Sequence, residues 1–209
     1  MKTRARSDKD KEIRRSKLLE AARKLFSERG YQSASVGEIT KEAEVSTGTF
    51  YLYFKSKPEI FRTLNIEGIT VLEKMIAESM ASREMTAEDR LKAIAGAYLS
   101  FFRDHRDYYD IISIRGLGQD EFIADSTLLE ALQNRVRDLM SFLESIIEEG
   151  IEKNEFNSVD PPRTAQMLWG LMDGILLLEQ RSVSEITGLT PDDIVEKGLL
   201  VLFEGLLKN

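Results

Sequence analysis

The feature that most constrains the fold is the spacing of apolar residues, which follows a helical period along nearly the whole chain. One apolar stripe runs from Leu18 to Phe26, and a second runs from Leu129 to Ile147. No segment of useful length alternates apolar and polar residues as a half-exposed strand would. The sequence therefore predicts an all-α protein.

Turn and capping residues divide this pattern into separate helices. All four prolines lie where helices can begin, and Gly30 and Gly150 lie where helices can end. We place an N-terminal three-helix domain at residues 1–57 and a C-terminal helical bundle at residues 58–209. The predicted helices, about nine in number, span residues 8–29, 36–43, 47–53, 57–82, 87–104, 106–115, 126–153, 161–181 and 191–207.

The composition argues against most kinds of catalyst. The 209 residues include no cysteine and one histidine, His105, which removes thiolate nucleophiles and His-rich metal sites. Glycine-rich phosphate loops and the G-x-S-x-G motif are also absent. We therefore expect no enzymatic activity, no metal and no cofactor. No uncharged stretch exceeds the ten residues from Ala93 to Phe102, too few to span a bilayer, so we expect a cytoplasmic protein with no membrane partner.

The charge is unevenly distributed between the two ends of the chain. Residues 1–57 hold 14 Lys and Arg against 8 Asp and Glu, whereas the remaining residues hold 15 against 28. A basic end attached to an acidic body indicates contact with a polyanion. The alternative is a solvated charged tail.

Two short predicted helices, at 36–43 and 47–53, carry the main functional signal. Ser35 with Glu38 forms a capping box for the first helix, and Ser46 can cap the second. Such a pair is typical of a helix-turn-helix, whose second helix enters the major groove of DNA; an ordinary helical hairpin is the alternative. Hydroxyl and lysine side chains suit phosphate and base contacts. The candidate DNA contacts are Ser35, Ser46, Thr47, Gly48, Thr49, Tyr51, Leu52, Tyr53, Lys55 and Lys57.

Residues 10–61 closely resemble the DNA-binding domain of the tetracycline-repressor (TetR) family of bacterial transcription regulators. The resemblance rests on LLEAARKLFSERGY at 18–31 and VGEITKEAEVSTGTFYLYFKSKPEIF at 36–61. It implies that Thr47, Gly48, Thr49, Tyr51 and Tyr53 lie in the recognition helix, and that Lys57 meets a backbone phosphate.

The chain departs from the family pattern at two positions of this motif. Glu44 stands at the turn where the family usually has glycine, and Thr40 stands where it usually has alanine. We expect Glu44 to adopt a left-handed conformation at a cost of about 1 kcal/mol. Both departures affect the angle between the two helices.

The resemblance also implies a C-terminal helical domain that binds a small ligand and forms a dimer through its last two long helices. The segments 161–181 and 191–207 are apolar on more than one face, which is typical of helices buried on two sides. A helix sandwiched within a monomer is the alternative. The candidate interface residues are Leu168, Met172, Ile175, Leu176, Leu199, Leu200 and Phe203.

The ligand pocket is expected between helices of this domain, where aromatic and sulfur-containing side chains are available. Each of these side chains is also compatible with an ordinary place in the core. The candidate pocket residues are Tyr98, Phe101, Phe102, Tyr108, Tyr109, Met140 and Trp169.

These observations predict a homodimeric, ligand-responsive transcriptional regulator, and a repressor in preference to an activator. It would bind double-stranded operator DNA with palindromic symmetry and be released by a small apolar or amphipathic inducer. The alternatives are an enzyme and a ligand-free architectural DNA-binding protein, each using the same helical body.

Overall fold

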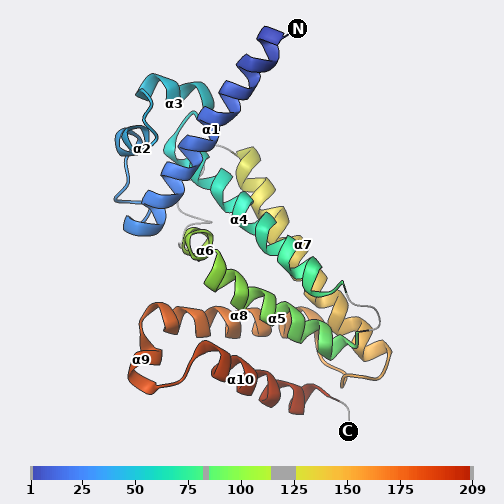
Figure 1. Ribbon diagram of the computed structural model, residues 1–209. Helices are drawn as coiled ribbons and strands as arrows, with labels where there is room; N and C mark the ends of the chain where they lie inside the picture. Colours follow the sequence, from blue (N-terminus) through green and yellow to red (C-terminus); the bar gives the residue numbers. More distant parts are fainter. Residues whose placement is uncertain (1, 82–84, 114–125, 208–209) are drawn as a thin grey trace. The chain divides into compact units, whose positions relative to one another are not determined.

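The computed structural model describes residues 2–81, 85–113 and 126–207, with side chains described outside residues 2–8, 126 and 202–204. The described residues form ten helices and no strand, which confirms the all-α prediction. The helices are α1 (Lys2–Arg29), α2 (Val36–Glu42), α3 (Thr47–Tyr53), α4 (Lys57–Ser79), α5 (Ala87–Asp104), α6 (Arg106–Ser113), α7 (Ser126–Glu152), α8 (Pro161–Gln180), α9 (Val183–Thr187) and α10 (Pro191–Leu206) (Figure 1).

Nine of these helices match the predicted segments closely, and α9 was not predicted. This five-residue helix lies between Ser182 and Gly188, both in the left-handed conformation. None of its residues is buried, so it has no apolar stripe for a periodicity argument to find. The predicted helix ends at residues 82 and 115 lie outside the described residues.

Side-chain caps explain why several helices begin where they do. Thr86 and Asp89 form reciprocal hydrogen bonds before α5, and Thr190 and Asp193 do the same before α10. At α8, the carboxylate of Asp160 accepts a hydrogen bond from the Arg163 amide at 2.9 Å. These caps satisfy amide groups that have no partner within the helix.

The described chain divides into two compact units, the first formed by residues 1–70 and 105–135. In this unit α1 packs against α2 and α6, and α2 packs against α3. The first unit thus extends past residue 57, where we expected the domain boundary, and it includes α6. Its fully buried large side chains include Leu18, Phe26, Ile39, Phe50, Ile60, Leu64 and Ile111.

The second unit is formed by residues 71–104 and 136–209. Here α10 packs against both α5 and α8. Gly150 lies within α7 rather than at its end. Glycine is required at this position because a side chain there would overlap the ring of Phe156 and the methyl group of Ala87. Among the described residues, no helix has the length and apolar character needed to cross a membrane.

Candidate nucleic-acid interface and ligand pocket

The turn between α2 and α3 is built from a left-handed residue. Ala43 closes α2 with a hydrogen bond from its amide to the Ile39 carbonyl, and Glu44 then adopts φ 55°. The amide of Val45 donates back to the Thr40 carbonyl at 2.9 Å. The expected left-handed conformation of Glu44 is confirmed, and this turn redirects the chain into α3.

The N-termini of both short helices are capped as the sequence predicts. Ser35 and Glu38 form a complete capping box, and these hydrogen bonds lower the pKa of the Glu38 carboxyl. The Ser46 hydroxyl accepts a hydrogen bond from the Thr49 amide at 3.1 Å and lies 2.9 Å from the Thr49 hydroxyl. The cap therefore orients the Thr49 side chain at the start of α3.

Helix α3 is held by one buried ring and presents most of its other residues to solvent. Phe50 is fully buried in the core of the first unit, and it is the only buried residue among the seven of this helix. Tyr51 and Leu52 are 57% and 79% exposed. Thr47 and Gly48 are exposed as well, whereas Tyr53 is half-buried against the core. This arrangement suits a recognition helix, because its surface is available for a groove.

Lys57 has a structural role that sequence reasoning missed. Its Nζ atom donates to the Tyr31 carbonyl at 3.0 Å and to the Ala34 carbonyl at 2.9 Å. The same atom lies 4.2 Å from the centre of the Tyr31 ring. The ammonium group therefore fastens the start of α4 to the loop between α1 and α2. Its expected phosphate contact remains a prediction.

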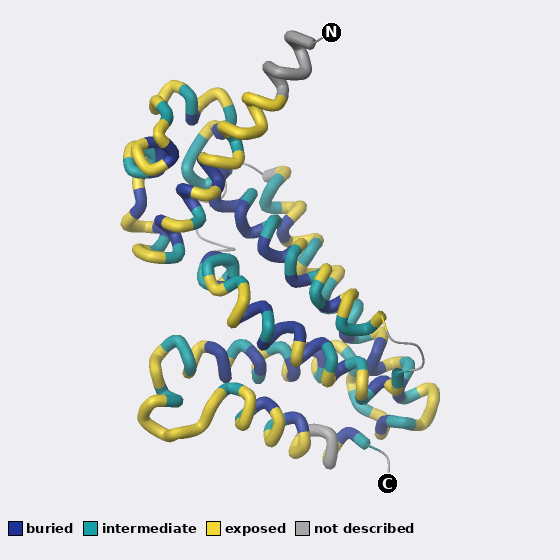
Figure 2. The backbone as a smooth tube through the Cα atoms, viewed as in Figure 1, coloured by how far each residue is buried: buried dark blue, intermediate teal, exposed yellow. Residues whose placement is uncertain are grey.

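A basic group on α1 also lies beside the end of the recognition helix. The guanidinium of Arg15 is 5.5 Å from the centre of the Phe54 ring, and Phe54 caps α3. The described side chains of residues 9–14 are exposed, and Figure 2 shows this part of α1 in yellow. The sequence does contain a signal for this basic group. When the apolar stripe that begins at Leu18 is continued toward the N-terminus at helical spacing, it reaches Arg14 and Arg15, which a packed core would not accommodate.

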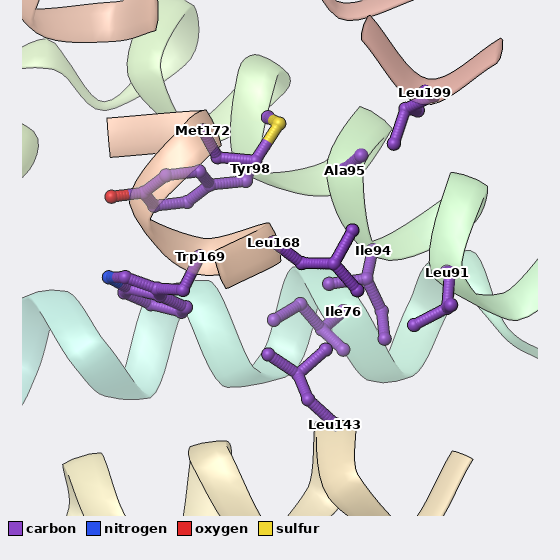
Figure 3. A pocket seen from close by; sticks show the side chains of 10 residues that line it. All are labelled: Ile76, Leu91, Ile94, Ala95, Tyr98, Leu143, Leu168, Trp169, Met172 and Leu199. Carbon is purple, nitrogen blue, oxygen red and sulfur yellow. The ribbon is translucent and has the colours of Figure 1, made fainter. Parts of the chain in front are cut away.

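Ten side chains line a pocket of about 490 Å³ in the second unit, a volume that includes its opening to solvent. Only two of them, Tyr98 and Trp169, carry nitrogen or oxygen in the side chain. Figure 3 shows these two rings together on one side of the pocket and the aliphatic side chains on the other. The lining residues are Ile76, Leu91, Ile94, Ala95, Tyr98, Leu143, Leu168, Trp169, Met172 and Leu199.

The polar atoms of the two rings meet at one carboxylate. The Tyr98 hydroxyl donates to Asp173 Oδ1 at 2.6 Å, and Trp169 Nε1 donates to Asp173 Oδ2 at 2.9 Å. The ring centres are 5.2 Å apart. Because both donors are bound by Asp173, the pocket itself offers mainly hydrocarbon surface.

Of the seven predicted pocket residues, only Tyr98 and Trp169 line this pocket. Phe101 and Phe102 are buried in the second unit, and Met140 is half-buried on α7. The other two, Tyr108 and Tyr109, lie on α6 in the first unit.

Tyr108 contacts α1 and α4 within the first unit. Its hydroxyl donates to Glu67 at 3.3 Å, and the Arg23 guanidinium lies 4.8 Å from its ring centre. Burial, together with the negative charge of Glu67, raises the pKa of this tyrosine. Two further contacts join α1 to α6, because the Ser27 hydroxyl donates to Asp110 and Arg23 forms an ion pair with Asp107.

The predicted interface residues are mostly buried within the chain itself. Leu200 is 44% exposed, and the side chain of Phe203 lies outside the described residues. The other five are at most 9% exposed, so they are not available to a partner; these are Leu168, Met172, Ile175, Leu176 and Leu199.

A different apolar surface lies on the same two helices. Met167 and Leu178 on α8 are 54% and 42% exposed, and Val201 on α10 is 69% exposed. Leu171 and Ile194 lie in the same hollow as Met167 and Val201. This surface, formed by α8 and α10, is called the α8–α10 face below.

The first unit has a buried core, a turn between α2 and α3 and an exposed surface on α3. Together these features define a helix-turn-helix DNA-binding protein. Residues 18–64 match the family model described as bacterial regulatory proteins of the tetR family. The chain is 28% identical over 168 residues to the fatty acid metabolism regulator protein of Bacillus subtilis (strain 168), covering 79% of this chain and 82% of that protein. By these matches, residues 18–64 form a DNA-binding domain of the tetR type, and the chain is a transcriptional regulator.

Solved structures with the same fold cover nearly the whole chain. FadR from Bacillus subtilis in complex with stearoyl-CoA is 23% identical with a TM-score of 0.71, covering 91% of this chain and 98% of that one. AibR in complex with isovaleryl coenzyme A and operator DNA is 19% identical with a TM-score of 0.73, covering 92% and 99%. Both units therefore have the fold of known regulators.

Proposed function

We propose that the protein is a homodimeric repressor that binds a palindromic operator and leaves it when an amphipathic ligand with a hydrocarbon chain binds. The observation that carries this proposal is the pocket of the second unit, whose walls are hydrocarbon apart from Tyr98 and Trp169. A coenzyme A thioester of a fatty acid is the first ligand to test. FadR and AibR, which share the fold, are described with such thioesters bound.

Recognition of DNA is assigned to α3 and the residues around it. The exposed Thr47, Gly48 and Tyr51 can approach base edges in the major groove, while Lys55 can neutralise a phosphate. Two copies of α3 in a symmetric dimer favour an inverted repeat with half-sites about one helical turn apart, or a multiple of it.

The α8–α10 face supports the dimer. Large apolar side chains such as Val201 and Met167 are rarely grouped on the surface of a monomer without a partner. Gly170 and Gly174 are exposed on α8 beside them, and small residues allow two helices to approach closely. A two-fold axis through this face would place the same surface of both subunits in contact.

Coupling between ligand and operator is assigned to α4. This helix begins at Lys57, beside the helix-turn-helix, and contributes Ile76 to the pocket wall. A ligand that prefers the position of α4 in which the protein binds DNA less well shifts the population toward that position. DNA affinity then falls by an amount set by the ratio of the ligand's affinities for the two positions.

The test begins with selection of bound fragments from genomic DNA, followed by footprinting and sedimentation analysis of the complex. We expect a protected inverted repeat, two chains per repeat, and an affinity that falls about 10³-fold or more between 50 and 200 mM salt. A protected site without two-fold symmetry, or a stable monomer at micromolar concentration, contradicts the proposal.

A further inference from the structure

The opening of the pocket can be located from the exposure of its lining residues. Nine of the ten are buried, including Tyr98 at 7% exposure. Trp169 is half-buried and is the most exposed of the ten, so we place the opening of the pocket beside it. An amphiphile whose hydrocarbon chain fills the pocket therefore has its polar end beside Trp169.

Asp173 is half-buried beside Trp169, one helical turn later on α8. Its two oxygen atoms accept hydrogen bonds from two neutral donors, Tyr98 and Trp169. Among the residues whose side chains are described, no lysine, arginine or histidine forms an ion pair with this carboxylate. The Asp173 side chain is thus half-buried and hydrogen-bonded to two neutral groups, with no ion pair to a described cation.

The hydrogen bonds of Asp173 also determine what the pocket wall offers to a ligand. Figure 3 shows the Tyr98 oxygen and the Trp169 nitrogen pointing to the same side, away from the aliphatic lining. Because Asp173 engages both atoms, neither is available inside the pocket to bind an anionic group. A ligand carboxylate at the opening would meet a negative charge without a compensating donor.

We propose that Asp173 is a specificity-determining residue that selects amphiphiles by the charge of the group next to the hydrocarbon chain. A neutral ester or thioester carbonyl is accepted at the opening, whereas the carboxylate of a free fatty acid is rejected. The inference rests on the proposed function, because it concerns the same ligand pocket. It narrows the ligand from amphiphiles in general to acyl esters and thioesters, in which the group next to the hydrocarbon chain is uncharged.

The experiment uses three probes with the same hydrocarbon chain: laurate, methyl laurate and laurylammonium, each below its micellar concentration. Trp169 is the only tryptophan of the chain, so its fluorescence reports occupancy of the pocket directly. Like-charge repulsion at a half-exposed site predicts that the intact protein binds methyl laurate about tenfold or more tightly than laurate. Laurylammonium binds at least as tightly as the ester.

The informative variant is Asp173→Asn. Its amide oxygen accepts from Trp169 and its amide nitrogen donates to the Tyr98 oxygen, so the rings keep their positions while the charge is removed. In this variant laurate and methyl laurate bind with equal affinity, and laurylammonium loses about tenfold. Glu148→Gln, which removes the same charge from an exposed position on α7, leaves all three affinities as they were.

The outcomes separate the two proposals. Equal binding of laurate and methyl laurate by the intact protein, or a preference that persists in Asp173→Asn, refutes the role of Asp173 while the ligand pocket stands. Failure of all three probes to bind either protein refutes the proposed ligand class, and this inference with it.

Discussion

Replacement of Lys57 by methionine measures how much the contacts between the start of α4 and the loop before α2 contribute to the free energy of unfolding. Methionine retains most of the aliphatic stem, so the change removes the ammonium group with little loss of packing. The two hydrogen bonds from Nζ to the carbonyls of Tyr31 and Ala34 involve a charged donor, and such bonds are each worth about 1.5–3 kcal/mol. The contact with the Tyr31 ring adds about 0.5–1 kcal/mol.

Lys57 is half-buried, and water can replace part of what is lost. We therefore expect the free energy of unfolding to fall by about 2 kcal/mol, measured by urea denaturation with circular dichroism. Lys55→Met is the matched control, because the Lys55 side chain is exposed, and it should change stability by less than about 0.5 kcal/mol. A loss below about 0.5 kcal/mol for Lys57→Met would refute the anchoring role. The salt dependence of operator binding tests its phosphate contact separately, since loss of one such contact lowers the slope by about 0.9.

Three further predictions concern the turn, the dimer and a helix cap. Glu44→Gly should raise the free energy of unfolding by up to about 1 kcal/mol, because glycine tolerates the left-handed conformation; a destabilised variant would contradict this. Val201→Asp should dissociate the dimer in light scattering and abolish operator binding, since it buries an unpaired charge, whereas Gln133→Asp, exposed on α7, should do neither. Ser35→Ala should lower the melting temperature at neutral pH. The Ser35 hydrogen bonds lower the pKa of Glu38 in the folded state, so their stabilisation is present above the ordinary pKa of a glutamic acid and is lost as the pH falls through the folded-state pKa. The difference between Ser35→Ala and the parent should therefore shrink in acid, and a constant difference from neutral to acid pH would contradict the assignment.

The helices and the DNA-binding motif could be predicted from the sequence because their determinants are local. Ser35, Ser46 and Asp160 each cap a helix through a residue three positions away, and such spacing can be seen in the sequence. The left-handed Glu44 followed from the family pattern of the turn.

The interface residues show where periodicity stops being informative. An apolar residue such as Leu176 has the same spacing whether it packs inside its own chain or against a second copy, and it proved to be fully buried within the chain. The exposed Met167 and Val201 were not selected, because only the packing of α5 against α10 and of α10 against α8 decides which side of each helix remains exposed.

The other features that the sequence did not predict depend on contacts between residues far apart in the chain. The partners of Lys57 lie 26 and 23 residues away in sequence, and Asp173 meets Tyr98 across 75 residues. Tyr108 and Tyr109 were expected in the ligand pocket because aromatic side chains are typical of pockets between helices. The chain ends α5 at Asp104 and starts α6 at Arg106, and α6 packs on α1, so these rings belong to the other unit.

The central claim is that one protein binds operator DNA and an acyl ligand with opposing effects. The most direct measurement is calorimetric titration of the dimer with stearoyl-CoA, once without DNA and once with saturating operator, beside an anisotropy titration of operator with and without the ligand. We expect the ligand to weaken operator binding by about 5- to 150-fold, and operator to weaken ligand binding by the same factor. Tight ligand binding that leaves operator affinity unchanged, in either direction of the titration, would contradict the central claim.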